Sequence, residues 1–243
     1  MILCICTINL NNSAGVERTA ASLKSVMSNP QIGCVFIDGL SKDNSLEIAR
    51  KYWPVEQILA ERDDGIYEAM NKALRYSAKY YLWLNSGDEL ADVDAEALLT
   101  LLSKGHDCIQ FSVEEVSPDT STSLWSASAK FSKTSIPSFH HAGLIVASDV
   151  IRRLSGYDQT YRMCADFKLA CQISNMNGIN YHSVPTVLSR FYRDGISSKN
   201  SLIYENFRVL WETKRSLLIP YFYHWFRMRY PVRMLMKNTL GNL

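Results

Sequence analysis

Acidic side chains recur in the first half of the sequence where apolar runs give way to polar turns. Asp38 and Asp88 each come after an apolar run, and Asp63 lies in the acidic loop 61–64. In an open α/β sheet, ligands bind just beyond the carboxyl ends of the strands. Carboxylates at successive strand ends therefore predict a charged ligand at one edge of a sheet, and a metal ion bound with it.

Asp88 is the candidate metal ligand. A hard cation such as Mg²⁺ or Mn²⁺ takes one or two carboxylates together with phosphate oxygens and water, so a single aspartate suffices when the ligand is a diphosphate. The alternative is that Asp88 caps the helix expected at 93–103. Its placement alongside Asp38 and Asp63, at neighbouring strand ends, favours the binding site.

The acidic loop and the helix after it also have ordinary structural interpretations. Asp63 or Asp64 can be the N-cap of a helix that begins at Gly65. Two adjacent carboxylates repel each other, however, and a base or a metal would help to hold them. Lys72, two turns into that helix, can be a surface residue, and Asn71 can be a hydrogen-bonded amide in the core.

Four residues of the second half are further candidates. Asp166 opens a helix, where it can cap the helix or act as a base. His140 and His141 precede an expected strand. Such a pair is more often packed or hydrogen-bonded than catalytic, and no third ligand at a useful spacing marks a zinc site. Arg193 lies beside a predicted turn, from which it can reach a phosphate.

The apolar pattern predicts how these residues are positioned. Short apolar runs bounded by polar turns predict buried strands, with helical spacing between them. Strands are expected at 2–8, 34–37, 57–60, 80–84 and 107–113, and helices at 16–27, 44–52, 65–78 and 93–103. Because strands that alternate with helices form βαβ units, the first half, to about residue 115, is predicted to be an α/β unit with a mainly parallel sheet and flanking helices.

The pattern changes in the second half of the chain. The serine- and threonine-rich stretch 117–138 is expected to be a loop or a hairpin. The strand expected at 181–191 contains Pro185, which cannot donate a hydrogen bond to a neighbouring strand, so this strand is predicted to lie at an edge of the sheet. A further strand is expected at 140–147, and helices at 149–154, 166–177 and 201–218.

The last stretch, 219–243, combines aromatic and basic residues. Its aromatics begin with Tyr221 and Phe222, its bases include Arg227 and Arg229, and no carboxylate side chain follows Glu212. Aromatic residues interleaved with bases suit an anionic lipid interface. The segment 201–243 is therefore predicted to be helical and to lie on a membrane surface. The alternative is a terminal helix that packs its aromatics on the core.

The composition limits the classes of protein that fit. With 243 residues, 47% of them hydrophobic, the chain fits one large domain, with or without an appendage. The net charge of +2 gives no general affinity for polyanions, so no nucleic-acid partner is expected. No apolar stretch reaches the roughly eighteen residues that would predict a transmembrane helix. The absence of a secretory leader and of any Cys-x-x-Cys pair predicts reduced thiols in the cytosol.

Seven short motifs follow one another over roughly residues 1–200. They are 7–12, 38–43, 61–72, 84–88, 140–141, 156–158 and 165–169, and the most specific is Gly65-Ile66-Tyr67-Glu68-Ala69-Met70-Asn71-Lys72. In this order they resemble the motifs of bacterial family 2 glycosyltransferases of the GT-A fold, particularly those that build O-antigen, capsular and colanic-acid-type polysaccharides. The resemblance implies a Rossmann-like, mainly parallel sheet with flanking helices, followed here by a C-terminal helical tail.

The resemblance also implies a function. The protein would be an inverting glycosyltransferase that moves a sugar from a nucleotide diphosphate sugar, UDP-linked, to a lipid-linked saccharide acceptor in the synthesis of a bacterial surface polysaccharide. Residues 1–115 would bind the donor, residues 116–200 of the same domain would bind the acceptor, and residues 201–243 would lie on the membrane. The protein would then be cytoplasmic and peripheral at the inner face of the cell membrane.

The resemblance assigns roles to single residues as well. Asp166 matches the catalytic base, and Asp88 matches the acidic member of a metal-binding triplet in which Ser86 replaces an aspartate of the general pattern. His141 stands where close relatives often carry glutamine. The other predicted donor-binding residues are Thr7, Asn9 and Asp38, facing the nucleotide, Asp63, near its base, and Gly65, Lys72, His140 and Arg193.

Two other functions are compatible with an α/β sheet. A nicotinamide-dependent oxidoreductase needs Gly-x-Gly-x-x-Gly after the first strand, whereas 9–15 contains a single glycine, Gly15. The second is a non-enzymatic scaffold on a degenerate transferase fold, and the incomplete metal triplet is the reason to consider it. Turnover of a nucleotide sugar would separate an enzyme from a scaffold.

Overall fold

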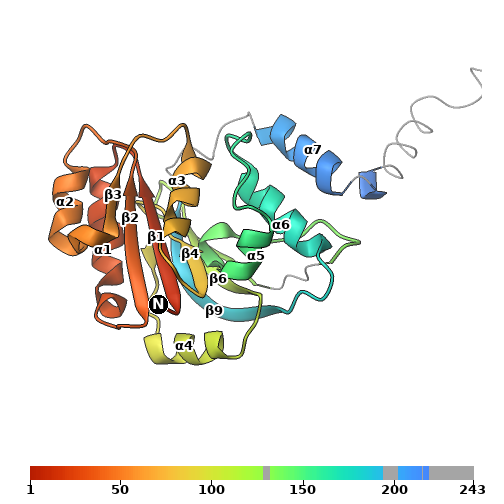
Figure 1. Ribbon diagram of the computed structural model, residues 1–243, viewed down its shortest axis with the longest axis horizontal. Coiled ribbons are helices and arrows are strands. Elements are labelled where there is room, and N and C mark those ends of the chain that lie inside the picture. The colour runs from red at the N-terminus through yellow and green to blue at the C-terminus, as the bar shows by residue number, and fades with distance from the viewer. Residues whose placement is uncertain (128–131, 194–201, 215, 219–243) are drawn as a thin grey trace, which may run out of the picture.

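The computed structural model describes residues 1–127, 132–193, 202–214 and 216–218 (Figure 1). Nine strands of this part form one sheet, with helices against both of its faces. The predicted membrane-surface stretch 219–243 lies outside the described residues, as does Ser201. No helix among the described residues combines the length and the apolarity needed to cross a bilayer.

The first half of the chain builds the parallel part of the sheet, as predicted. Strand β1 lies between β2 and β4, and β3 lies outside β2; every one of these neighbours is parallel. Every residue of β1, β2 and β4 is buried, as expected for strands covered on both faces. The bounds are β1 Leu3–Asn9, β2 Ile32–Asp38, β3 Ile58–Ala60 and β4 Tyr80–Trp83.

The second half makes the sheet mixed rather than mainly parallel. The remaining strands are β5 Glu89–Leu90, β6 Cys108–Val116, β7 Thr122–Trp125, β8 Leu144–Ala147 and β9 Tyr181–Tyr192. Strand β8 inserts antiparallel between β4 and β6. Strand β7 pairs with β6 as the predicted hairpin. Strand β5 was missed because two residues carry no readable pattern.

Strand β9 explains how the sheet tolerates Pro185. The strand runs parallel to β6, and its register shifts between Val184 and Val187, so Pro185 lies in an irregular stretch. Strand β5 pairs with Arg190 and Ser189 alone. Among the described strands, the part of β9 around Pro185 therefore has a neighbour on one side, and the predicted edge position is confirmed for that part.

The helices cover the two faces of the sheet in two groups. Helices α1, α2 and α4 pack on the face of Leu3 and Ile5, whereas α3, α5 and α6 pack on the face of Cys4 and Cys6. Helix α7 packs against α6 (Figure 1). The bounds are α1 Ser13–Met27, α2 Ser45–Tyr52, α3 Ile66–Lys72, α4 Ala95–Ser103, α5 Ser148–Arg153, α6 Ala165–Asn175 and α7 Leu202–Thr213.

Among the helix boundaries that differ from the predictions, two have a clear local reason. Helix α1 begins at Ser13, before the predicted Val16, because the Asn12 side chain accepts a hydrogen bond from Gly15 N and caps it. Helix α3 ends at Lys72, continues as a 3₁₀ turn over Ala73–Arg75, and gives way to extended backbone before the predicted end at 78. Two further 3₁₀ turns are Val55–Gln57 and His141–Gly143.

Candidate functional site

The carboxyl ends of β1 and β2 bring Asn9 and Asp38 together. The two residues are register partners, and Asn9 Nδ2 donates to Asp38 Oδ2 over 2.8 Å. Asp38 also accepts from Ser41 N and Ser41 Oγ, each over 2.7 Å. Asp38 is fully buried. Its carboxylate therefore holds the loop after β2 through two hydrogen bonds from Ser41 and joins it to β1 through the third, from Asn9.

Two polar atoms at this edge have no partner among the described residues. Thr7 Oγ1 and Asn9 Oδ1 are both buried without a hydrogen bond. A buried polar atom left unpaired costs about 1–3 kcal/mol, and such atoms are rare in folded proteins unless a ligand or water pairs with them. Thr7 and Asn9 are thus the residues of this edge with hydrogen-bonding capacity left for a ligand.

Asp63 lies beside the same edge. A Cβ atom at Gly39 would stand 2.6 Å from Asp63 Oδ2, so the carboxylate lies directly against the loop after β2. Burial raises the pKa of Asp63, although the charge of Lys72 opposes the rise. The N-cap position of α3 is Gly65, at a φ of 151°, and no side chain caps it. The N-cap interpretation of Asp63 and Asp64 is therefore wrong.

Lys72 is buried and Asn71 is partly buried, and both fix the elements around α3. Lys72 is 5% exposed, and its Nζ donates to the backbone oxygens of Glu61 and Arg62, so the surface interpretation is wrong. These two hydrogen bonds attach the acidic loop 61–64 to α3. Asn71 exchanges two hydrogen bonds of 2.8 Å with the backbone of Tyr157, which confirms the core-amide interpretation.

Gly156 is required for the contact between α3 and the segment before α6. Its φ is 78°, and a Cβ atom there would stand 2.5 Å from Asn71 Oδ1. A side chain would thus meet both backbone strain and a clash. This explains the motif 156–158: its glycine lets the backbone of Tyr157 reach Asn71.

Asp88 lies in a buried turn rather than at the end of a strand. Strand β4 ends at Trp83, and Asp88 comes just before β5. Asp88 is 4% exposed, and its Oδ1 accepts from Tyr192 N over 3.1 Å. The N-cap of α4 is Asp94, whose side chain accepts two backbone hydrogen bonds, so the capping interpretation of Asp88 is wrong.

The turn that carries Asp88 is anchored on α1. Thr19 Oγ1 donates to Asp88 O over 2.7 Å and accepts from Gly87 N over 2.9 Å. Asn12 Nδ2 donates to Ser86 O over 2.9 Å and lies 3.4 Å from Ser86 Oγ. The backbone around Ser86 and Asp88 is therefore held by the first helix.

The donor atoms near Asp88 fit a cation that is shared with a ligand. No group of three or more histidine, cysteine or acidic side chains that could hold a metal occurs in the described parts of the chain. Asp88 supplies one buried carboxylate, and Ser86 supplies a hydroxyl nearby. These are too few ligands for a metal site built from protein atoms alone. The set fits Mg²⁺ or Mn²⁺ when phosphate oxygens complete the coordination.

Asp166 lines a pocket of about 260 Å³ between the two halves of the chain. Its Oδ1 accepts from Tyr67 Oη over 3.0 Å and from Phe167 N over 2.8 Å. His141 Nδ1 lies 3.9 Å from Oδ2. The other lining residues are Ile66, Met70, Asn85, Met163, Cys164, Phe191 and Asn206.

Asp166 does not occupy the cap position of α6. The N-cap residue is Cys164, and Asp166 lies in the first turn, where it accepts from the next backbone amide. The first turn of a helix favours an ionised carboxylate. The capping alternative is therefore wrong, and the carboxylate faces the pocket.

The two histidines next to the pocket are neutral near pH 7. Burial lowers the pKa of His140 to about 3, and the charges of His141 and Arg193 add to this. Burial also lowers the pKa of His141, although Asp166 opposes the change. Arg193, predicted to reach a phosphate, forms an ion pair with Glu115. Oε1 of the same Glu115 lies 3.7 Å from His140 Nε2.

Helix α7 is attached to the segment that leads into α6. The Glu205 carboxylate accepts from the backbone amides of Arg162, Met163 and Cys164 over 2.8 to 3.0 Å. This attachment places Asn206 in the lining of the pocket. No role at the site was predicted for Tyr67, Glu205 or Asn206. The spacing of apolar residues in a helix does not indicate which distant part of the chain a side chain contacts.

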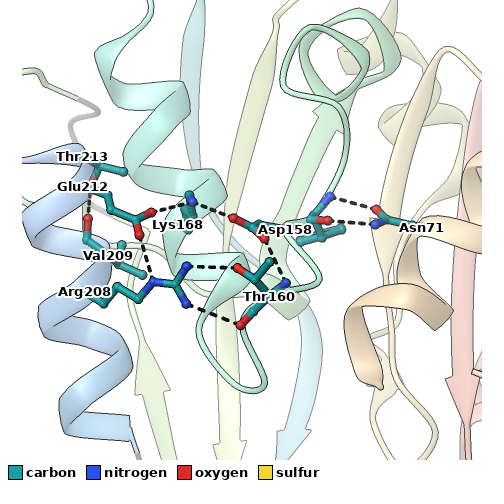
Figure 2. Close-up of polar contacts among 9 residues, drawn as sticks. Asn71, Asp158, Thr160, Lys168, Arg208, Val209, Glu212 and Thr213 are labelled. Carbon is teal, nitrogen blue, oxygen red and sulfur yellow. Dashed lines mark hydrogen bonds and ion pairs between the residues drawn. The ribbon is translucent and has the colours of Figure 1, made fainter. Parts of the chain in front are cut away.

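A polar network extends the attachment of α7 (Figure 2). Lys168 Nζ lies 2.7 Å from Asp158 Oδ2 and 2.6 Å from Glu212 Oε2, and Arg208 donates to Glu212 and to Thr160. Burial alone would raise the pKa of Asp158, but hydrogen bonds from Lys168 and Thr160 hold it at about 2. The network joins α7, α6 and the segment 158–160.

Comparison with known families identifies the first two thirds of the fold. The model of the family described as Glycosyl transferase family 2 matches residues 4–163, well over half of the chain. Two curated relatives are the uncharacterized glycosyltransferases MT1564 and Rv1514c of two Mycobacterium tuberculosis strains. Each is 32% identical over 110 residues, a match that spans 42% of this chain and 40% of the relative.

Solved structures with the same fold are known. TarS 1–349 of S. aureus, in complex with UDP-GlcNAc, matches with a TM-score of 0.68 at 13% identity, over 86% of this chain and 64% of that one. The mannosyltransferase PcManGT of Pyrobaculum calidifontis, in complex with GDP-Man and Mn²⁺, matches with a TM-score of 0.56 at 14% identity, over 77% and 56%. The α/β sheet with flanking helices is therefore the predicted GT-A fold.

Proposed function

The chain belongs to glycosyl transferase family 2, and on this premise we propose that it is an inverting glycosyltransferase. It moves a sugar from a nucleotide diphosphate sugar, UDP-linked, to a hydroxyl of a lipid-linked saccharide in the synthesis of a bacterial surface polysaccharide such as an O-antigen. The observation that carries the proposal is the Asp166 carboxylate, which lines a pocket together with residues of the first half of the chain.

The donor is proposed to lie over the carboxyl ends of β1, β2 and β4. Support comes from Thr7 Oγ1 and Asn9 Oδ1, which are buried without partners among the described residues and could pair with nucleotide hydroxyl and base groups. Asp63 lies against the same loop. UDP-GlcNAc in TarS and GDP-Man in PcManGT are the donors that related folds bind, and their extension to this chain is part of the proposal.

A divalent cation, Mg²⁺ or Mn²⁺, is proposed to be held by Asp88 together with the donor diphosphate. When bound, such a cation offsets the negative charge that develops on a leaving diphosphate. The hydrogen bond from Tyr192 N keeps the Asp88 carboxylate oriented, and the contacts of Thr19 fix the backbone of its turn. Ser86 offers a hydroxyl in place of a second carboxylate.

The transfer is proposed to be a single displacement. Asp166 Oδ2 takes the proton of the acceptor hydroxyl, and an electron pair of that hydroxyl oxygen forms the new bond to the anomeric carbon. The bond from this carbon to the diphosphate oxygen breaks, and its electrons stay on the diphosphate. Attack from the side opposite the leaving group inverts the anomeric configuration. General base assistance contributes about 10²–10⁴-fold to such a step.

We further propose that the protein works in the cytoplasm, on the inner face of the cell membrane, where a lipid-linked acceptor lies. The aromatic and basic sequence of 219–243 supports this, at roughly 1 kcal/mol per base near an anionic surface. Cutting the chain after Leu218 should release the protein from anionic vesicles. If the shortened chain sediments with the vesicles as well as the full chain does, the membrane proposal is wrong.

A thermal-shift screen tests the donor proposal. UDP- and GDP-linked sugars would be added to the full chain with and without Mn²⁺, and one nucleotide sugar is expected to raise the melting temperature in a Mn²⁺-dependent way. NMR of the transfer product should then show the inverted anomeric configuration. A retained configuration would contradict the displacement. Binding of a nucleotide sugar without any turnover would favour a scaffold instead of an enzyme.

A further inference from the structure

Tyr67 joins the two halves of the protein at the carboxylate of Asp166. It belongs to the string Gly65-Ile66-Tyr67, on the helix that follows the acidic loop, and its Oη donates to Asp166 Oδ1 over 3.0 Å across a sequence separation of 99 residues. The same helix holds the acidic loop through Lys72. One rigid element thus contacts both the predicted donor side and the predicted base.

The two oxygens of the Asp166 carboxylate have different surroundings. Oδ1 accepts from Tyr67 Oη and from Phe167 N, over 3.0 and 2.8 Å. Oδ2 faces His141 Nδ1 at 3.9 Å, beyond hydrogen-bond distance. Among the described contacts, Oδ1 is therefore the occupied oxygen, and Oδ2 is the oxygen that can accept a proton.

The packing around Tyr67 leaves its hydroxyl little freedom. Tyr67 is 4% exposed, and its ring stacks on Tyr157 with centroids 5.7 Å apart. The backbone of Tyr157 is in turn tied to Asn71 by two hydrogen bonds. Burial and the nearby charge of Asp166 raise the pKa of Tyr67, so the hydroxyl keeps its proton and remains a donor.

We propose that Tyr67 is a positioning residue for the catalytic base. Its hydroxyl holds Oδ1 of Asp166, so that Oδ2 is the atom that takes the proton of the acceptor hydroxyl as the oxygen of that hydroxyl bonds to the anomeric carbon. The inference rests on the proposed role of Asp166 as the base.

The substitution Tyr67→Phe removes the hydroxyl and keeps the ring. A carboxylate that loses a hydrogen-bond donor is protonated more easily, so the pH midpoint of its titration rises. The midpoint is read from the side-chain ¹³C signal of Asp166, assigned by its loss in Asp166→Asn, and needs no substrate.

Tyr81→Phe is the matched control. Tyr81 is fully buried, and its hydroxyl donates to the backbone oxygen of Tyr76 over 2.7 Å, so this variant also loses one buried tyrosine hydrogen bond. It should leave the Asp166 midpoint unchanged. Equal midpoints in the parent and Tyr67→Phe would overturn the inference, as would an equal rise in Tyr67→Phe and Tyr81→Phe.

Turnover separates this inference from the proposed function. With a donor found in the screen, Tyr67→Phe should lower kcat about tenfold, leave the donor KM unchanged, and move the acidic limb of the pH–rate profile to higher pH. An unchanged kcat and acidic limb, in a parent that turns the donor over, would contradict the role of Tyr67. A parent that turns over no donor would count against the proposed function, and the ¹³C midpoints would still decide whether Tyr67 tunes Asp166.

Discussion

The edge at the ends of β1 and β2 and the pocket around Asp166 are built in different ways. At the edge, Asn9, Asp38 and Ser41 come from neighbouring elements, and sheet register places them together. In the pocket, Asp166 depends on Tyr67, which lies 99 residues away, and on a segment that Glu205 of α7 holds. The edge follows from the parallel sheet itself, whereas the pocket follows from how later helices pack on it.

The family model covers the two regions differently. It matches residues 4–163, which include the edge but end before Asp166 and α7. Substitutions at the edge and around the pocket can therefore test each region separately.

The substitution Asp88→Ala tests the donor side. Removing the carboxylate that is proposed to hold the cation should abolish metal-dependent binding of the diphosphate nucleotide, because phosphate oxygens and water alone bind the cation weakly. The fold should persist, because the turn backbone is also held by Thr19. Calorimetry with Mn²⁺ present measures the affinity. Equal affinity in the parent and the variant would remove Asp88 from the site.

The substitution Glu205→Ala tests the acceptor side. It leaves the amides of Arg162, Met163 and Cys164 without their acceptor, so the free energy of unfolding should fall by about 2–3 kcal/mol. Tyr204→Ala is the control on the same helix, because Tyr204 is 84% exposed and should change stability by no more than about 0.5 kcal/mol. Urea unfolding of both variants measures the difference. Equal midpoints would mean that α7 does not hold this segment.

A smaller effect on stability is expected when the pH falls, from the polar network that joins α7, α6 and the segment 158–160. The pKa of Asp158 is about 2, below its ordinary value of 3.8, so its interactions stabilise the folded state above about pH 4 and are lost as the pH falls toward 2. The parent should exceed Asp158→Asn in stability by about 1–2 kcal/mol at pH 6. Denaturant unfolding at pH 6 and pH 2.5 should show this gap closing, and a constant gap would contradict the ionic origin.

The sequence allowed the donor edge to be predicted far better than the pocket. Asp38 could be placed because a buried apolar run that ends in a polar residue marks a strand end, and parallel strand ends meet at one edge. Asn9 was expected there through the family resemblance alone. The burial of Lys72 could not be predicted, because a long side chain on a helix can point to solvent or fold back onto a loop. The contact between Tyr67 and Asp166 depends on packing between α3 and α6, which a local pattern does not encode.

Asp166 is proposed to be the base of a transferase whose donor nucleotide lies over the ends of β1, β2 and β4, and Asp166→Asn tests this role most directly. The variant nearly keeps the shape of the side chain and removes the proton acceptor. With the donor found in the screen, we expect near-normal donor affinity by calorimetry and a turnover at least about a hundredfold lower than that of the parent. Full turnover together with full donor affinity in Asp166→Asn would contradict the account and leave Asp166 as a structural residue of α6.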